Sequence, residues 1–331
     1  MRKNICLTHE YIAVSGRHTY NEGGALLLSW PLSGFTAAFE GERAIIHFSG
    51  GASDIDVQPV YVSVTVDGRK QKFALSRADE KILLDDLGAG RHTLTFRRIS
   101  EGNVSIAPAS LEVFGDVCEI LPPPKGSDLR MEFIGDSISC GYGVLGSADG
   151  KEYNTFEEDA ELTYASLCAK ALGADIRVTA KGGHGIVADY TGLPTYLIPE
   201  FFEWKHTGGK DKHDFSSWIP QVVVINAGTN DSIGNVDEQT FIEGAMRFAA
   251  RVREVYPDAV IFWAYGMMES KYESVLSAHI ADMGADGEKI YFVPLPYTGV
   301  DGKGFAAHPN VVANERAAQV LIKAVRDVLH I

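Results

Sequence analysis

Three successive prolines, Pro122–Pro124, separate two parts of the chain that differ in their hydrophobic pattern. Proline has no backbone N–H to donate, so a run of three forms a stiff, extended spacer and belongs neither inside a sheet nor inside a helix. We therefore predict a linker at residues 121–128, between a first domain of residues 1–120 and a second domain of residues 129–331. The 331 residues are enough for two domains that each have a core.

The first domain has the pattern of short β-strands. Apolar or alternating runs are separated by turn residues, and Asp67-Gly68 is the clearest hairpin signal. The runs are Ala44–Phe48, Val60–Val66 and His92–Arg97. Because no helical period is visible from about Tyr11 to Val117, we predict an all-β sandwich or jelly roll.

The second domain alternates between predicted strands and predicted helices. This alternation predicts a three-layer α/β fold, in which helices cover both faces of a parallel sheet. In such sheets ligands bind beyond the carboxyl ends of the strands. The predicted strands are Arg130–Ile134, Asp175–Thr179, Gln221–Asn226, Val260–Ala264 and Lys289–Pro294, and the predicted helices are Leu162–Leu172, Asp237–Tyr256, Ser270–Met283 and Val311–Leu329.

Small and polar residues follow the first three predicted strands, in the segments 135–137, 181–185 and 226–231. The first segment reads Gly-Asp-Ser, and it places Ser137 at a turn from a buried strand into a helix, a position that suits a nucleophile. Gly-Asp-Ser alone is also an ordinary turn in which Asp and Ser cap a helix. Three such segments at one edge of a sheet favour a functional site.

His308 lies in a loop just before the last predicted helix, and Pro309 fixes the chain at the start of that helix. The loop should return to the same edge of the sheet as Ser137. Taken alone, this residue could be an exposed histidine without a special role. Together with Ser137 it becomes the natural general base.

Composition and charge limit the partners that we expect. The chain is 45% hydrophobic and 22% charged, as in soluble globular proteins, and its net charge is −14. Residues 121–331 carry most of this charge, with 18 basic and 29 acidic residues. Such a surface repels phosphates, so we expect neither nucleic acid nor an anionic membrane as a partner, whereas neutral substrates are compatible with it.

The four cysteines are scattered without a C-x-x-C pair, so we expect reduced thiols, no metal and no cofactor. The N-terminus lacks an apolar stretch of signal-peptide length, and no apolar run is long enough to span a bilayer. We therefore expect a cytoplasmic protein, although a secreted chain trimmed of its leader would look the same. The sequence indicates no oligomeric state.

Four segments resemble the successive conserved blocks of the SGNH (GDSL-type) hydrolases, in the same order, and the resemblance covers the whole second domain. A narrower resemblance is to carbohydrate esterase family 2, whose members place a jelly-roll β-sandwich before a flavodoxin-like hydrolase domain. The first resemblance rests on Gly135-Asp136-Ser137, Gly183, Gly228–Asp231 and His308-Pro309, and the second on Glu161–Tyr164, Gly182–Ile186, the Tyr196–Trp218 region and Val222–Asn226.

The resemblance implies a role for each matching residue. Ser137 would attack an ester carbonyl, and His308 would take its proton. The backbone N–H groups of Ser137 and Gly183 and the side-chain amide of Asn230 would hold the oxyanion. The implied substrate is the O-acetyl ester of a carbohydrate such as a xylo- or manno-oligosaccharide. Two alternatives stay open: a lipase or thioesterase for longer acyl chains, and a carbohydrate-binding protein with an inactive hydrolase domain.

The sequence departs from the superfamily pattern at one position. An aspartate usually stands three residues before the histidine and orients the imidazole, and here that residue is Phe305. Either a backbone carbonyl near Ala306 orients His308, or Asp301 reaches it from the loop as a third catalytic residue. We favour the carbonyl, which selects the tautomer but stabilises charge less than a carboxylate does.

Three aromatic residues near the strand ends could stack on sugar rings. Tyr142 follows the nucleophile, and Trp263 and Tyr265 lie at the fourth predicted strand. Trp263 is inside an apolar run, so it could equally belong to the core. We include all three as possible substrate-binding residues.

Overall fold

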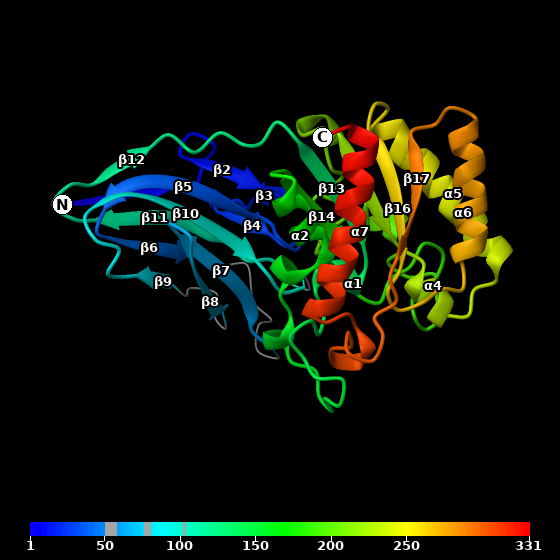
Figure 1. Cartoon of the computed structure of the whole chain (residues 1–331). Coiled ribbons are helices and arrows are strands. Elements are labelled where there is room, and N and C mark those ends of the chain that lie inside the picture. The colour runs from blue at the N-terminus through cyan, green and yellow to red at the C-terminus, as the bar shows by residue number, and fades with distance from the viewer. Residues whose placement is uncertain (50–57, 76–80, 102–103) are drawn as a thin grey trace. The chain divides into compact units, whose positions relative to one another are not determined.

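The computed structural model describes residues 1–49, 58–75, 81–101 and 104–331 (Figure 1). The chain forms two compact units. One contains Met1–Gly126 together with Lys205–Asp211, and the other contains Ser127–Trp204 and Lys212–Ile331. Among these residues, none of the helices combines the length and the apolar character needed to cross a membrane.

The segment Lys205–Asp211 differs from the sequence prediction, which placed it in an uninterrupted second domain. It belongs to the first unit by its contacts. The buried indole Nε1–H of Trp30 donates a hydrogen bond to the Lys205 carbonyl oxygen at 2.8 Å. The Thr207 N–H donates to the Ser29 hydroxyl at 3.0 Å. Main-chain contacts of this kind leave no pattern in the sequence.

In the first unit all regular elements of the described residues are strands, and all their pairs are antiparallel. One large sheet has the order β1-β11-β6-β9, and a second has β12-β5-β10-β7-β8 with β2 beside β5, while β3 and β4 form a separate two-stranded sheet. The strands are β1 Arg2–Cys6, β2 Ile12–Ser15, β3 His18–Tyr20, β4 Leu26–Leu28, β5 Gly34–Gly41, β6 Arg43–Phe48, β7 Val60–Val66, β8 Arg69–Leu75, β9 Lys81–Leu84, β10 Gly90–Arg98, β11 Pro108–Phe114 and β12 Glu119–Leu121.

Apolar side chains of both sheets meet in a single core. Phe96 of β10 and Phe35 of β5 come from one sheet, and Leu111 of β11 comes from the other. The residues Asp67 and Gly68, both with positive φ, join β7 to β8, as in the tight turns that match the twist of a hairpin. The predicted β-sandwich is therefore confirmed.

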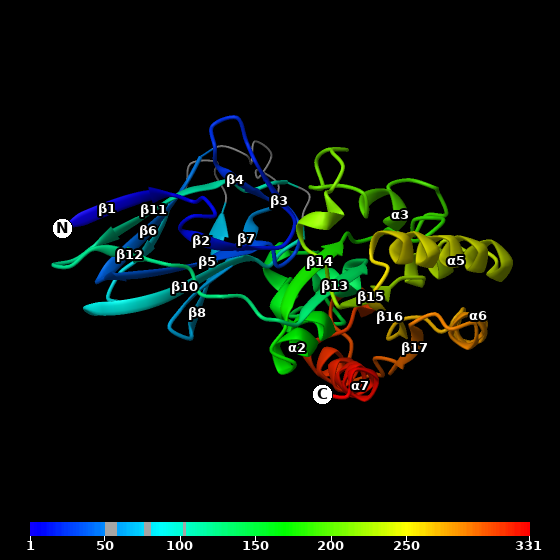
Figure 2. The same ribbon diagram turned by 90° about the horizontal axis from the view of Figure 1, so that it is seen from above.

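The second unit is built on a five-stranded sheet of order β14-β13-β15-β16-β17, and every pair in it is parallel. Helices α2 and α7 cover one face, and α3 and α5 cover the other (Figure 2). The predicted three-layer α/β fold is confirmed. Its elements are β13 Arg130–Gly135, α1 Ser137–Cys140, α2 Tyr164–Ala171, β14 Asp175–Ala180, α3 Ile198–Phe201, β15 Val222–Asn226, α4 Thr229–Ile233, α5 Glu238–Val255, β16 Val260–Gly266, α6 Glu273–Ala285, β17 Ile290–Leu295 and α7 Val311–Leu329.

The strand order reverses at β13, because the chain passes from β13 to β14 on one side and then to β15 on the other. Ligands bind at such a switch point in open α/β sheets. The register sets Gly135 level with Ala180 of β14 and with Asn226 of β15. The three loops that follow these residues therefore begin at one edge of the sheet.

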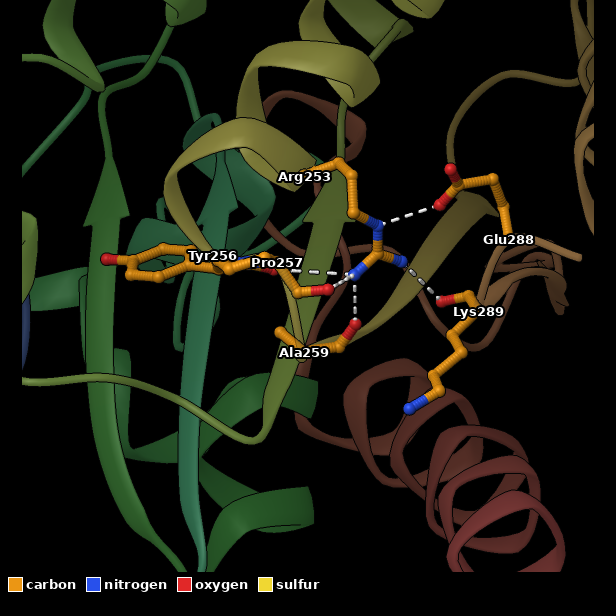
Figure 3. A network of polar contacts seen from close by, with 6 residues as sticks. All are labelled: Arg253, Tyr256, Pro257, Ala259, Glu288 and Lys289. Carbon is orange, nitrogen blue, oxygen red and sulfur yellow. Dashed lines mark hydrogen bonds and ion pairs between the residues drawn. The ribbon is translucent and has the colours of Figure 1, made fainter.

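The opposite edge of the sheet is held by Arg253, near the end of α5. Its guanidinium donates to the carbonyl oxygens of Tyr256, Pro257, Ala259 and Lys289 and pairs with Glu288 at 2.8 Å (Figure 3). Ala259 and Lys289 directly precede β16 and β17. One side chain thus ties the last turn of α5 to the amino ends of two strands.

Candidate active site

Ser137 is held where β13 turns into the short helix α1. Asp136 caps this helix, since its Oδ1 accepts a hydrogen bond from the Ile138 N–H at 3.0 Å. Gly141 ends the helix in the left-handed conformation with φ 82°. The side chain of Ser137 is consequently fixed at the carboxyl end of the central strand, where 7% of the residue remains exposed.

His308 lies directly against Ser137. Its Nε2 is 2.8 Å from the Ser137 Oγ, and its Nδ1 is 3.2 Å from the carbonyl oxygen of Ala306. A carbonyl only accepts, so Nδ1 carries the hydrogen and Nε2 presents its lone pair to the serine hydroxyl. Burial lowers the pKa of His308 to about 4, which keeps the imidazole neutral at neutral pH.

Asp301 does not take part in this arrangement. Its carboxylate is 65% exposed and is paired with Arg316 of α7, with Oδ2 at 2.6 Å from Nη2 and Oδ1 at 3.1 Å from Nη1. The possibility that Asp301 is a third catalytic residue is therefore wrong for this structure. The physical reason is the nearby guanidinium, which satisfies both carboxylate oxygens.

Gly183 and Asn230 follow β14 and β15 at the same edge of the sheet. Among the described residues, no acceptor takes the N–H of Ser137 or of Gly183. The Asn230 side chain is buried, and its Nδ2 donates to Asp136 Oδ2 at 3.1 Å and to the His184 carbonyl at 3.0 Å. Both hydrogens of that amide are thus used in hydrogen bonds within the protein.

Asp231 supports the loop that carries Gly183. Its fully buried carboxylate accepts hydrogen bonds from the N–H groups of Ile186, Val187 and Ala188 at 2.9, 2.8 and 3.1 Å. Burial raises the pKa of Asp231. A carboxylate bound by three successive N–H groups fixes the turn at these residues. Within the described residues, no three His, Cys, Asp or Glu side chains are grouped closely enough to hold a metal ion.

The sequence model of the GDSL-like Lipase/Acylhydrolase family matches residues 133–319, more than half of the chain. The chain belongs to this family. The predicted hydrolase class is thereby confirmed at the level of the family. A second model, of the carbohydrate esterase 2 N-terminal domain, matches residues 14–124, so the predicted resemblance extends to the sandwich.

Two relatives align with nearly the whole chain. The cellulase/esterase CelE of Acetivibrio thermocellus is 28% identical over 328 residues, which cover 96% of this chain but only 39% of CelE. An acetylxylan esterase / glucomannan deacetylase of Cellvibrio japonicus is 24% identical over 340 residues, covering 98% of this chain and 91% of the relative.

Solved structures of family two carbohydrate esterases share the fold. The esterase from Cellvibrio japonicus aligns with a TM-score of 0.89 at 21% identity, covering 100% of this chain and 98% of that one. The esterase from Clostridium thermocellum, solved in complex with cellohexaose, aligns with a TM-score of 0.87 at 27% identity, covering 96% and 99% of the two chains. Both alignments span the sandwich as well as the GDSL-like domain.

For two of the three aromatic residues, the prediction that they bind substrate is wrong in this GDSL-like hydrolase. Trp263 and Tyr265 of β16 are 0% and 1% exposed, and the Trp263 indole donates to the Ala227 carbonyl at 3.3 Å. They belong to the core. Tyr142 does reach the site, because its ring centroid is 4.6 Å from that of His308. The same ring stacks on Tyr153 at 4.5 Å and lies 6.1 Å from Phe305.

Tyr190 is a site residue that the sequence analysis missed. It is 58% exposed, and its N–H donates to the Gly183 carbonyl at 3.0 Å. Its ring lies beside Gly183, since a Cβ placed on that glycine would be 3.1 Å from Tyr190 Cδ1. The only sequence signal was an aromatic residue in the same loop as Gly183.

Proposed function

We propose that this chain is a serine esterase that removes O-acetyl groups from a carbohydrate, with Ser137 as nucleophile and His308 as general base. The observation that carries the proposal is the 2.8 Å contact between His308 Nε2 and Ser137 Oγ, with Nδ1 directed to the Ala306 carbonyl. Two relatives from Cellvibrio japonicus, each named acetylxylan esterase / glucomannan deacetylase, support acetylated carbohydrate as the substrate class.

In the first half of the reaction, Ser137 Oγ forms a bond to the acetyl carbonyl carbon while His308 Nε2 takes the hydroxyl proton. The tetrahedral intermediate carries its negative charge on the former carbonyl oxygen. As this intermediate collapses, the bond to the sugar oxygen breaks, and the proton on Nε2 passes to that oxygen. The products at this stage are the free sugar hydroxyl and an acetyl ester of Ser137.

In the second half, His308 Nε2 takes a proton from water, whose oxygen attacks the acetyl carbon. The second tetrahedral intermediate releases acetate, and the proton returns to Ser137 Oγ. The oxyanion of each intermediate would be held by the N–H groups of Ser137 and Gly183 and by the Asn230 amide. Because both hydrogens of the amide already form hydrogen bonds within the protein, Asn230 would exchange one of these bonds for a bond to the oxyanion.

The neutral charge of acetylated sugars suits an acidic chain, and the exposed ring of Tyr190 beside Gly183 offers a face on which a sugar can stack. A preference for long acyl chains would require a deep apolar pocket next to Ser137. The proposed function requires no such pocket, because it predicts that the acyl group is small and that the alcohol part of the ester is a carbohydrate.

The test compares wild-type protein with Ser137→Ala on acetylated xylo- and manno-oligosaccharides and on 4-nitrophenyl acetate, butyrate and octanoate. We expect release of acetate by the wild type, the highest kcat/KM for acetate among the nitrophenyl esters, and loss of nearly all turnover in the variant. A preference for octanoate would support a lipase instead. Tight binding of the oligosaccharides with no hydrolysis of any ester would indicate an inactive hydrolase domain.

A further inference from the structure

The turn that carries His308 rests on the loop that follows the nucleophile helix α1. The Phe305 N–H donates to the Gly143 carbonyl at 3.1 Å. Gly304 approaches the same carbonyl so closely that a Cβ on Gly304 would be 2.3 Å from its oxygen. Two segments that hold the two proposed catalytic residues are thereby joined through their main chains.

Three glycines of the loop make room for the side chain of Phe305. A Cβ would be 2.8 Å from Phe305 Cβ at Gly143, 2.6 Å from Phe305 Cβ at Gly146 and 2.7 Å from Phe305 Cδ2 at Gly150. Carbon atoms that are not bonded do not approach this closely. Gly146 and Gly150 do not have a positive φ, so space, and not backbone conformation, requires glycine there.

The turn between Phe305 and His308 has a conformation that needs support. Ala306 and Ala307 are consecutive residues in the left-handed region, with φ 50° and φ 61°. Alanine rarely adopts this conformation, and strained turns persist only where the surrounding structure holds them. Within the turn, the His308 N–H donates to the Phe305 carbonyl at 3.0 Å, and the Gly304 N–H donates to the His308 carbonyl at 2.7 Å.

We propose that Phe305 is a positioning residue for His308: its side chain packs with its Cβ against Gly143 and Gly146 and with its ring against Gly150, and so holds the strained turn whose Ala306 carbonyl orients the imidazole. The inference rests on the proposed role of His308 as the general base. In this arrangement the packed Phe305 side chain keeps the His308 imidazole oriented, which is the role that the usual aspartate has in other members of the superfamily. Because Phe305 would only orient His308, its removal should slow the proton transfer by His308.

The experiment compares Phe305→Ala, Phe305→Leu and Gly150→Ala with the control Gly284→Ala. The control glycine also has an ordinary φ, but its nearest neighbour, the Ile290 carbonyl oxygen, is 3.6 Å from a built Cβ. Displacing a catalytic group by about 1 Å costs roughly 10²-fold in rate. We expect kcat on 4-nitrophenyl acetate to fall roughly 10- to 100-fold in Phe305→Ala and Gly150→Ala, with KM within about threefold. Phe305→Leu should recover part of the loss, and Gly284→Ala should match the wild type.

A second set of variants separates positioning from a general structural role. In a His308→Ala background the imidazole is absent, so Phe305→Ala should lower the residual activity no further than His308→Ala alone. Equal losses from Phe305→Ala in both backgrounds, or unchanged kcat in both Phe305→Ala and Gly150→Ala, would overturn the positioning role. Full activity of His308→Ala would instead refute the proposed function, so the two failures are distinguishable.

Discussion

The imidazole Nδ1 of His308 lies 3.2 Å from the carbonyl oxygen of Ala306, two residues earlier in the chain. The main chain of the turn therefore fixes the tautomer that leaves Nε2 free to accept the Ser137 proton. A carbonyl dipole stabilises an imidazolium less than a carboxylate does, so in the proposed mechanism the protonated histidine would be less favourable than in a full triad.

Asp301→Asn should have little effect on catalysis. We expect kcat/KM within about threefold of the wild type, because Asp301 pairs with Arg316 at the surface and not with His308. Neutralising the aspartate of a true triad costs roughly 10⁴-fold in kcat. Steady-state kinetics on 4-nitrophenyl acetate distinguish these outcomes, and a collapse at unchanged Tm would make Asp301 the third catalytic residue.

In the pH profile, kcat/KM should begin to fall only at an unusually acidic pH. The proposed reaction needs neutral His308, and burial lowers the pKa of His308 to about 4. We therefore expect kcat/KM to rise with pH through about 4 and then to stay level through neutrality. Protonation also favours the unfolded chain, where the pKa of histidine is about 6.5, so the same group destabilises the fold as the pH falls from 6.5 towards 4.

A control distinguishes titration of His308 from acid unfolding. Protein held at pH 4 and returned to pH 7 should regain its full rate, since only a proton has been exchanged. A decrease of kcat/KM with an apparent pKa near 6.5 would show that the imidazole is accessible to water in solution.

Tyr190→Ala should weaken the use of large substrates selectively. Because Tyr190 is exposed beside Gly183, we expect KM for acetylated oligosaccharides to rise about 10-fold, while the rate on 4-nitrophenyl acetate changes little. Trp263→Phe is the matched comparison. Because Trp263 is buried, this substitution should lower Tm but leave KM unchanged for both the acetylated oligosaccharides and 4-nitrophenyl acetate. Equal effects of Tyr190→Ala on both substrates would remove Tyr190 from sugar recognition.

The sequence predicted those features of the structure that are visible within one short segment of the chain. The strand-end segments around Ser137, Gly183 and Asn230 were recognisable, since each joins a buried strand to a short polar turn. Helices α3 and α4 were not predicted, because 4 and 5 residues are too few to show a helical period.

Other features depended on contacts between residues far apart in the chain. Trp263 and Tyr265 lie near the carboxyl end of β16, where the sequence alone does not tell an aromatic residue that faces a ligand from one that belongs to the core. The pairing of Asp301 with Arg316 joins a loop to α7. The contact of Trp30 with Lys205 uses a main-chain oxygen, which any residue provides.

Arg253→Met should lower stability and leave catalysis unchanged. The substitution removes the ion pair with Glu288 and leaves four carbonyl oxygens without their guanidinium donor, so we expect a loss of about 2 to 3 kcal/mol in the free energy of unfolding. Arg253 lies at the amino ends of β16 and β17, away from Ser137. Arg247→Met, on the same helix and 70% exposed, is the control that should change neither property. Equal Tm values for the two variants would contradict the structural role of Arg253.

The central claim is that an acetyl group passes through Ser137, and a rapid-quench experiment tests it most directly. The wild-type protein is mixed with excess 4-nitrophenyl acetate, stopped with acid within milliseconds, digested and analysed by peptide mass spectrometry. The account predicts an acetyl group on Ser137 that forms together with a burst of nitrophenol, and neither signal in Ser137→Ala. Turnover at the wild-type rate by Ser137→Ala, or an acetyl group on another residue with the same burst, would contradict it.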